Sequence, residues 1–583
     1  MKRPELIAAL SLILFLCGIW VAPLQEPDEG RYADIARSMI RSGDWLAPKL
    51  NGVLYFEKPP LFFWLQAVSM KAMGASEAPA RLPAAVAAAL LMAVSFGLSR
   101  RLYGNSVGLM TAGIMIASPG LAFFFRAGIP DVLLAALVAS AIGAIRGPCV
   151  DDRPPTLGER LLFWLACGLA FLCKGPVALV VPWTGLAFFT ALTRKTAPIH
   201  RLVLDPVGLV LFVSVATPWY LAMEARHPGY LKIFFIDQNI GRLVDGAKFD
   251  RNEPFWYYAP VFVGVFAPWT LFLPEACARV WKALRSALPT SHARPQTELD
   301  RSRLFLSAFV IPALIVFSIA ESRLAYYLLP LALPVSALLA DAVVLEADGR
   351  PRRPGALSSR LYALAAASLV IGLVFCAYGW AGASRLLPSW LIGSLSTEKG
   401  ALLSEALRRT AGPVGVWLLG LALASGISAR LTRRARVESA LIPLFVALIA
   451  FFCAAPWHAR SLVGLNSGRE IADIVKGEVS AEDEVILYQR YYRSIPFYLD
   501  RPVIIWNATF SEFGRAPTEA ELRRYSLQKQ DARVASLWNG TGHTVAIVCG
   551  VEDLAEFETA VGDARPRRLI GRVGRVRILE NER

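Results

Sequence analysis

The stretch Gln25-Glu-Pro-Asp-Glu-Gly-Arg-Tyr-Ala-Asp34 decides how the chain is organised, because it follows directly on the apolar run Leu6–Leu24. Charged side chains so close to an apolar run lie at a membrane–water boundary, since burying them in hydrocarbon is costly. A proline followed by acidic residues is typical of the first turn of a helix. Asp28, Arg31 and Tyr32 then share one helix face. The stretch is therefore either an acidic cap on a helix or part of a polar site at the membrane surface.

The composition indicates a membrane protein built mostly from helices. Of 583 residues, 55% are hydrophobic and 18% are charged, and the mean hydropathy is +0.46. Apolar runs of about the length that spans a bilayer recur along the chain. The net charge is +15, but Lys and Arg gather in short loops between apolar runs, which is typical of membrane orientation and not of nucleic-acid binding. None of the five histidines is spaced from another like a chelating pair.

The apolar runs predict an all-α membrane domain with about 13 transmembrane helices and a cytoplasmic N-terminus. One further run, Pro60–Met70, is short and flanked by Lys58 and Lys71, so we interpret it as an interfacial helix. Nearly all basic loops are then cytoplasmic, whereas counting this run as a span would move every one of them outside. The opening stretch and the C-terminus fall on the outer face.

Two domains are predicted. Residues 1–456 form the transmembrane catalytic domain, with interfacial helices in 25–80 and a long polar and aromatic outer loop at 224–256 that could act as a lid. Residues 457–583 form a small α/β domain outside the membrane. Strands are predicted at Glu484–Tyr488, Pro502–Trp506 and His543–Cys549, and helices at Ser467–Lys476 and Glu519–Leu527.

A second polar cluster, Tyr55-Phe-Glu-Lys-Pro-Pro60, places an acid and a base ahead of two prolines. Glu57 and Lys58 point in different directions, because adjacent residues do not share a helix face. The proline after Lys58 favours an extended backbone. An extended lysine at the membrane surface suits a lipid-linked phosphate, and it equally suits an ordinary interfacial lysine.

Further charged and aromatic residues fall on the same outer face, at the ends of spans. Asp131 is either a helix cap or, with a second carboxylate, an acid or base for catalysis. Lys174 is either an anchor of its span or a phosphate contact. Arg323, Tyr326 and Tyr327 open another span, where tyrosines of the membrane interface are the simpler interpretation. Their gathering on one face indicates a functional site.

Four motifs together resemble a known family. Glu26–Tyr32, Tyr55–Leu61, the acid Asp131 after its proline, and Tyr326–Pro330 are similar to motifs of the bacterial 4-amino-4-deoxy-L-arabinose lipid A transferases. These belong to the polyprenyl-phosphate-dependent glycosyltransferases of the C-type fold, which include the protein O-mannosyltransferases. The resemblance covers the membrane region and weakens over Arg279–Arg303 and the C-terminal domain. It implies a periplasmic α/β domain above an active-site cavity in the helical domain.

The resemblance also implies roles for the candidate residues. Asp28 matches the catalytic acid of the family and Asp131 its second acid, whereas Glu29 and Asp34 are expected to be structural. The predicted contacts of the donor and its phosphate are Arg31, Tyr32, Tyr55, Lys58, Lys174, Arg323, Tyr326 and Tyr327. Glu57 matches a position that in relatives helps a histidine to hold a divalent metal such as zinc. The matching segment here, 248–256, has no histidine, so no cofactor is predicted as a requirement.

The function that the resemblance implies is transfer of a sugar, 4-amino-4-deoxy-L-arabinose, from undecaprenyl phosphate to a lipid A phosphate at the periplasmic face of the bacterial inner membrane. The phosphate leaving group mainly needs its charge neutralised, so we expect one inverting displacement. Two alternatives stay open. One is the same kind of donor used on a protein or another glycan, and the other is a transporter of lipid-linked substrates, for which the sequence shows neither broken helices nor inverted repeats. We expect a monomer that contacts membrane lipids and binds no nucleic acid.

Overall fold

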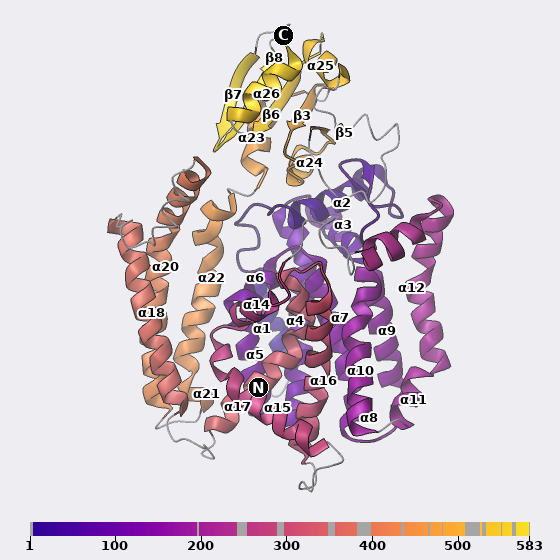
Figure 1. Ribbon diagram of the computed structural model, residues 1–583, viewed down its shortest axis with the longest axis vertical. Helices are drawn as coiled ribbons and strands as arrows, with labels where there is room; N and C mark the ends of the chain where they lie inside the picture. The colour runs from indigo at the N-terminus through magenta and orange to yellow at the C-terminus, as the bar shows by residue number, and fades with distance from the viewer. Residues whose placement is uncertain are drawn as a thin grey trace.

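The computed structural model consists of a large helical body with a small sheet domain at one end (Figure 1). The structure describes residues 4–194, 197–241, 253–287, 297–347, 356–381, 398–432, 437–464, 467–480, 482–507, 525–526, 532–540, 542–549, 551–562 and 567–581.

The helical body begins with α1 (Pro4–Leu16), α2 (Asp28–Ser42), α3 (Leu61–Met73), α4 (Glu77–Tyr103), α5 (Asn105–Ile116), α6 (Pro119–Arg126), α7 (Pro130–Ala144), α8 (Arg146–Val150) and α9 (Leu157–Lys174). It continues with η1 (Gly175–Leu179), α10 (Val180–Thr193), α11 (Ala197–Val203), α12 (Pro206–Arg226), the π-helix η2 (Lys232–Ile240), α14 (Tyr258–Phe266), η4 (Trp269–Phe272) and α15 (Leu273–Ala287). The last helices of the body are α16 (Glu298–Ile319), η5 (Ala325–Leu331), α17 (Ala332–Ala347), α18 (Ala356–Ala381), α20 (Glu398–Leu431), α21 (Val437–Ala440) and α22 (Ile442–Gly464). A two-stranded hairpin, β1 (Lys49–Leu50) and β2 (Val53–Leu54), lies between α2 and α3.

Seven of the described helices are long and apolar enough to cross a membrane, or nine when each of two bent helix pairs counts as one span. The pairs are α5 with α6, bent by 70°, and α14 with the helical stretch Trp269–Ala287, bent by 107°. A multi-pass helical membrane domain is therefore confirmed, but the count of 13 is not. Several predicted spans form helices below spanning length: α1 has 13 residues and α7 has 15, which at 1.5 Å per residue rise only about 20 Å.

The apolar stretch Leu157–Thr193 counts as one of the seven, yet it contains two helices that run in opposite directions. Arg160, near the start of α9, lies 2.5 Å from Asp205, which follows α10 by 12 positions. Trp164 donates its indole N–H to the carbonyl of Leu202 at 3.0 Å. The rings of Trp164 in α9 and Trp183 in α10 also lie 5.6 Å apart, so the chain folds back between the two helices, after Lys174.

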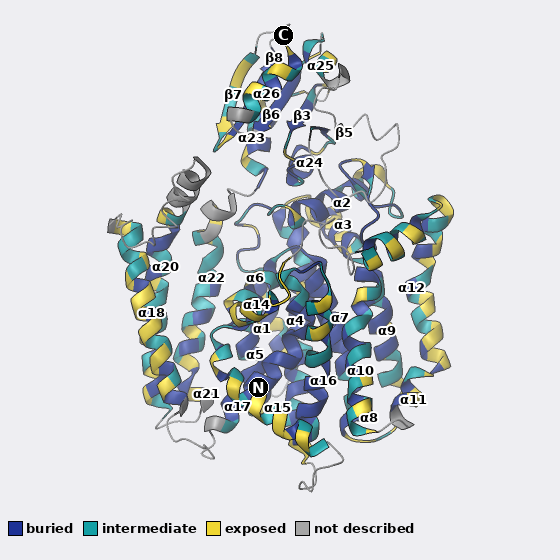
Figure 2. Cartoon of the chain, viewed as in Figure 1, coloured by how far each residue is buried: buried dark blue, intermediate teal, exposed yellow. Residues whose placement is uncertain are grey.

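Burial separates central helices from peripheral ones (Figure 2). The apolar stretch Ala325–Leu345 is 94% buried, whereas Leu357–Trp380 in α18 is only 17% buried. Alanine and glycine at the contacts allow close packing, as where α18 runs beside α20 (Figure 1). Exposed apolar side chains on α12, α18 and α20 face outward, as expected of helices that contact lipid.

The C-terminal domain is a six-stranded sheet with the order β5-β4-β3-β6-β8-β7. Its elements are α23 (Arg469–Glu478), β3 (Glu484–Tyr488), α24 (Ser494–Leu499), β4 (Ile504–Trp506), β5 (Tyr525–Ser526), α25 (Ala532–Asn539), β6 (Thr544–Cys549), α26 (Val551–Val561), β7 (Arg567–Val573) and β8 (Val576–Asn581). The strands β5, β4, β3 and β6 are parallel, and β8 runs antiparallel to β6 and β7.

The three predicted strands and the first predicted helix of this domain are confirmed. The second predicted helix, Glu519–Leu527, is wrong at Tyr525–Ser526, which pair with β4 as a strand, and its other positions lie outside the described residues. The hairpin of β7 and β8 was not predicted, because β7 carries arginines and glycine in place of a clear apolar alternation.

Candidate active site

The stretch Gln25–Asp34 begins helix α2, and its charged side chains reach different partners. Glu29 is buried and forms a paired contact with Arg81 of α4, at 2.7 Å and 2.6 Å. It also accepts N–H groups from Gln25 and Gly128. Burial raises the pKa of Glu29, but Arg81 and these N–H groups outweigh burial and hold it below its usual value. Glu29 thus joins α2 to α4 and to the turn before α7, which is a structural role.

Two residues of the stretch attach the C-terminal domain. Glu26 accepts the backbone N–H groups of Arg493 at 2.9 Å and Ser494 at 2.7 Å, at the start of α24. Burial raises the pKa of Glu26 although these bonds act in the opposite direction. Gly30 is required by close packing, because a Cβ atom there would lie 2.7 Å from the backbone nitrogen of Ser494. The sheet domain therefore rests directly on the motif (Figure 1).

Asp34, at the end of the stretch, also has a structural position. It accepts the backbone N–H of Asn51 at 2.7 Å, and the side chain of Asn51 bonds both backbone groups of Val503 in the C-terminal domain. Burial raises the pKa of Asp34 to about 6 despite the N–H that it accepts.

Asp28 occupies the first position of α2 and is held on two sides. Tyr326 donates its hydroxyl to one carboxylate oxygen at 3.2 Å, and Arg31 lies 3.7 Å from the other. Tyr32, on the same helix face, is buried against Phe62 and Phe63. Burial, with the nearby charge of Asp28, raises the pKa of Tyr32 well above its ordinary value, so it stays a neutral phenol.

Asp131 and Lys174 form a buried ion pair between the start of α7 and the end of α9. The Lys174 ammonium also lies 4.4 Å from the ring centroid of Tyr327 and 5.6 Å from that of Tyr326. Cation–π contacts of this kind stabilise a partly desolvated charge. Asp131, Lys174 and the tyrosine pair, which were predicted from separate parts of the sequence, therefore meet at this point.

A cavity of about 380 Å³ opens beside this ion pair, and we call it the Lys174 cavity. Its polar lining residues are Glu57, Lys58, Asp131, Lys174, Gln238, Asn239, Ser322 and Tyr327. The remaining walls are apolar, as suits a lipid chain. Asp28 is not among the lining residues, and the Tyr326–Tyr327 pair, whose rings are 5.5 Å apart, connects it to the cavity.

Tyr55 lies just behind the cavity wall. Its hydroxyl donates to Glu57 at 3.2 Å, and its ring packs edge-on against Phe63. Among the described residues, no group of three or more His, Cys, Asp or Glu side chains is placed to hold a metal. The residues around Glu57 that the structure describes therefore do not make up a metal site, and residues 242–252 lie outside them.

Arg323 does not line the Lys174 cavity. Its guanidinium donates to the backbone carbonyls of Glu253 and Glu321, and to that of Ser318 at 2.8 Å. In this arrangement it fixes the chain around the start of η5, on which Tyr326 and Tyr327 lie. Its contacts are those of a positioning residue.

The sequence reasoning missed several residues of the site. Gln238 and Asn239 enter the cavity from η2, inside the loop predicted as a lid, and polar amides in an apolar aromatic segment were the available signal. Arg81 was missed as the partner of Glu29. Its signal was a charge at the edge of a long apolar run, where an ionised side chain needs a partner.

The chain is similar in sequence to known membrane glycosyltransferases. Residues 57–220 match the family model described as dolichyl-phosphate-mannose-protein mannosyltransferase. An undecaprenyl phosphate-alpha-4-amino-4-deoxy-L-arabinose arabinosyl transferase of Aeromonas hydrophila is 31% identical over 58% of this chain and 60% of the relative. The chain is similar to aminoarabinosyl transferases. A second such transferase, from Pseudomonas fluorescens, is 29% identical over 73% of this chain and 71% of the relative.

A solved structure extends this similarity to the fold of the whole chain. ArnT from Cupriavidus metallidurans bound to undecaprenyl phosphate superposes with a TM-score of 0.80 at 23% identity, covering 99% of this chain and 97% of ArnT. The chain therefore has the fold of ArnT. The resemblance predicted from the motifs is confirmed. The sequence alignment with the Aeromonas relative spans about three fifths of that protein's length.

Proposed function

We propose that this protein is an inverting glycosyltransferase that moves 4-amino-4-deoxy-L-arabinose from undecaprenyl phosphate to a phosphate group of lipid A. The observation that carries the proposal is the Lys174 cavity, where residues of three motifs surround one pocket with polar groups at one end and apolar walls elsewhere. The names of the relatives supply the donor and the sugar. The undecaprenyl phosphate bound to ArnT, which has the same fold, agrees with this donor.

The phosphate of the donor is proposed to bind Lys174 and Lys58, with its polyprenyl chain along the apolar walls. Asp131 holds the Lys174 side chain in position before the donor arrives. As the bond between sugar and phosphate breaks, negative charge grows on the phosphate, and fixed cations stabilise that charge most in a site that excludes water. Tyr326 and Tyr327 orient the ammonium through their rings.

Asp28 is proposed to orient the attacking group from the other side of the tyrosine pair. A phosphate acceptor is already an anion, so little proton transfer is needed, whereas a serine or threonine hydroxyl would require a base. Tyr326 and Arg31 hold the carboxylate in place. The acceptor oxygen attacks the anomeric carbon opposite to the departing phosphate, and one displacement of this kind inverts the configuration without a covalent enzyme intermediate.

The proposed setting is the inner membrane of a bacterium, with the N-terminus in the cytoplasm and the site and C-terminal domain in the periplasm. The sheet domain and α2 lie at the same end of the molecule (Figure 1), which supports placing both on one side. We retain 13 spans, the domains 1–456 and 457–583 and a monomeric state as part of the proposal. The antiparallel course of α9 and α10 supports a count above nine.

Lipid A from cells with and without the gene tests the proposal. Mass spectrometry should show an added aminoarabinose on phosphate only when the gene is expressed. Unchanged lipid A under conditions where the sugar donor is made would refute lipid A as the acceptor. The match to a protein mannosyltransferase family model makes glycosylated periplasmic protein the outcome to look for in that case.

A further inference from the structure

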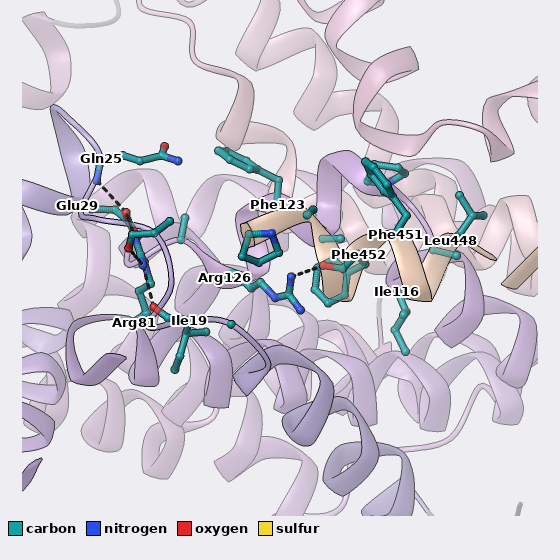
Figure 3. Close-up of a pocket in the computed structure, with 18 residues that line it drawn as sticks. Ile19, Gln25, Glu29, Arg81, Ile116, Phe123, Arg126, Leu448, Phe451 and Phe452 are labelled. Carbon is teal, nitrogen blue, oxygen red and sulfur yellow. Dashed lines mark hydrogen bonds and ion pairs between the residues drawn. The ribbon is translucent and has the colours of Figure 1, made fainter. Parts of the chain in front are cut away.

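A second hollow is lined at one end by residues of the motif Gln25–Asp34 (Figure 3). It has a volume of about 270 Å³ and runs between the end of α1, the bend between α5 and α6, and residues 448–456 of α22. We call it the α22 groove. Its walls are almost entirely apolar, and Ile116, Phe123, Leu448 and Phe451 form part of them. One end reaches Gln25 and Glu29, which flank the proposed catalytic acid in the sequence.

A buried arginine, Arg126, lines the middle of this groove. Only 9% of its surface is exposed. One terminal nitrogen donates to the carbonyl of Phe452 at 2.5 Å, and the other donates to that of Leu14 at 3.1 Å. The guanidinium carbon lies 3.4 Å from the ring centroid of Phe452, and the Nε atom has no hydrogen-bond partner among the described residues. The Nε–H group of Arg126 is therefore a buried donor that no described residue satisfies.

The charge of Arg126 is also not neutralised. Within the part of the chain that the structure describes, its contacts are carbonyl oxygens, the Cys453 side chain and an aromatic ring, and no carboxylate forms an ion pair with it. Arg81, which lines the same groove, differs because Glu29 binds it at 2.6 Å. A buried cation without an anion is costly, and in a membrane protein it indicates a binding role. The groove is thus suited to a ligand with a negative charge.

The surroundings of the groove indicate that this ligand is a lipid. Phe123 on its wall is 52% exposed, and Trp20 and Trp457, each next in the sequence to a lining residue, are 57% and 50% exposed. Exposed tryptophans near the end of a membrane domain are typical of the lipid–water interface. The apolar walls fit an acyl chain, and Arg126 fits a phosphate, which arginine binds through several parallel hydrogen bonds.

We propose that the α22 groove binds the acceptor, an anionic glycolipid that carries phosphate and acyl chains, with one phosphate on Arg126. This inference rests on the proposed function and assigns donor and acceptor to separate sites. Ala127 lines the groove and Asp131 lines the Lys174 cavity, so the single turn that follows α6 separates the two. Arg126 is a binding residue in this account and takes no part in the displacement itself.

Steady-state kinetics test the role of Arg126. Arg126→Gln should raise the KM for lipid A about tenfold, the loss expected for one hydrogen bond to a charged group, and leave the KM for the donor unchanged. Arg126→Lys keeps the charge and should recover part of the affinity. An unchanged KM for lipid A in Arg126→Gln, or an equal rise for both substrates, would overturn the proposal.

Photo-crosslinking tests the groove without any assay of transfer, and it leaves Arg126 intact. A photoreactive benzoylphenylalanine replaces Phe123 at the groove and, as the control, Val210 of α12, which is 65% exposed. The protein is placed in nanodiscs that contain phosphatidylglycerol and a small fraction of lipid A, and captured lipids are identified by mass spectrometry. Position 123 should capture lipid A in excess of its share, and position 210 should not. The same lipid mixture at both positions would refute the assignment.

The two tests separate failure of the inference from failure of the proposed function. Enriched capture of lipid A at position 123 without any sugar transfer would leave the groove in place and refute the transfer reaction. Transfer to lipid A without enriched capture, and with normal kinetics in Arg126→Gln, would leave the function in place and refute the groove. Lipid A stripped of both phosphates should lose the enrichment, and equal capture of the stripped form would overturn the role of the phosphate.

Discussion

The ion pair of Asp131 and Lys174 is predicted to stabilise the fold and to bind the donor. A double-mutant cycle separates its effect on stability from its effect on donor binding. Both side chains are almost fully buried, with 2% and 6% of their surface exposed. Removing one partner of a buried ion pair leaves the other charge uncompensated and costs about 3–5 kcal/mol. Asp131→Asn and Lys174→Met should therefore each lower the free energy of unfolding by about that amount.

The double variant, Asp131→Asn with Lys174→Met, removes both charges at similar volume. Replacing a buried ion pair by uncharged groups is often neutral for stability, so the double variant should unfold close to the wild-type midpoint, although the two single effects add to about 6–10 kcal/mol. It should nevertheless bind undecaprenyl phosphate much more weakly than the wild type, because only Lys58 remains of the two lysines proposed to bind the phosphate.

Unfolding by SDS, followed by tryptophan fluorescence, measures the stability of the four proteins. Equilibrium binding of undecaprenyl phosphate measures the second property. The reasoning would be refuted by a double variant that is destabilised by the full sum, since the two charges would then act independently. Wild-type affinity for undecaprenyl phosphate in the double variant would equally remove Lys174 from the donor site.

Two further predictions concern the contact between the motif and the C-terminal domain. Gly30→Ala should weaken the attachment of this domain, because the added Cβ atom would clash with the backbone of Ser494. Limited proteolysis should therefore release the domain faster than in the control Gly97→Ala, where nothing lies within 4 Å of the new atom. Equal cleavage of the two variants would show that the contact does not hold the domain. In the folded protein Asp34 keeps its proton up to about pH 6, whereas in the unfolded chain it loses the proton near pH 4. This carboxyl group therefore contributes about 3 kcal/mol to the free energy of unfolding. The contribution is fully present below pH 4 and is lost as the pH rises through 6. Asp34→Asn should flatten that part of the dependence of the unfolding midpoint on pH, and an unchanged profile would contradict the assigned pKa.

The helical class and the location of the site could be predicted from the sequence, because both depend on local patterns. Apolar runs are visible one at a time, and polar residues that interrupt them on one side stand out. Asp28, Lys58 and Asp131 were predicted as site residues in this way. Their meeting around one site could not be predicted from spacing, since it depends on how α2, α7 and α9 pack.

The number of spans could not be predicted as well, because hydropathy does not measure helix length or bending. The run Val107–Phe124 reads as one span, whereas the structure breaks it between α5 and α6 with a bend of 70°. Pro119 begins the second helix. A proline in the sequence predicts a break in a helix but not the angle between the two helices. In the C-terminal domain, β7 was not predicted because its arginines interrupt the alternation of apolar and polar residues that is typical of a strand.

Partners distant in the sequence were the least predictable part. Glu29 pairs with Arg81 across 52 positions, and Glu26 binds the start of α24 across more than 460. The sequence was enough to assign the stretch Gln25–Asp34 to a membrane surface. Which of its acidic residues are structural became clear only from their contacts in the structure. Only Asp28 remains directed toward the tyrosine pair of the Lys174 cavity.

A reconstituted transfer reaction tests the central claim most directly. Purified protein in nanodiscs receives undecaprenyl phosphate-linked aminoarabinose and lipid A, and mass spectrometry follows the mass of lipid A over time. The account predicts that the wild type adds aminoarabinose to a lipid A phosphate. Asp28→Asn should bind the donor with normal affinity but transfer the sugar about a hundredfold more slowly, the loss expected when the attacking group is no longer oriented. Unmodified lipid A with the wild type, or equal rates for the two proteins, would contradict it.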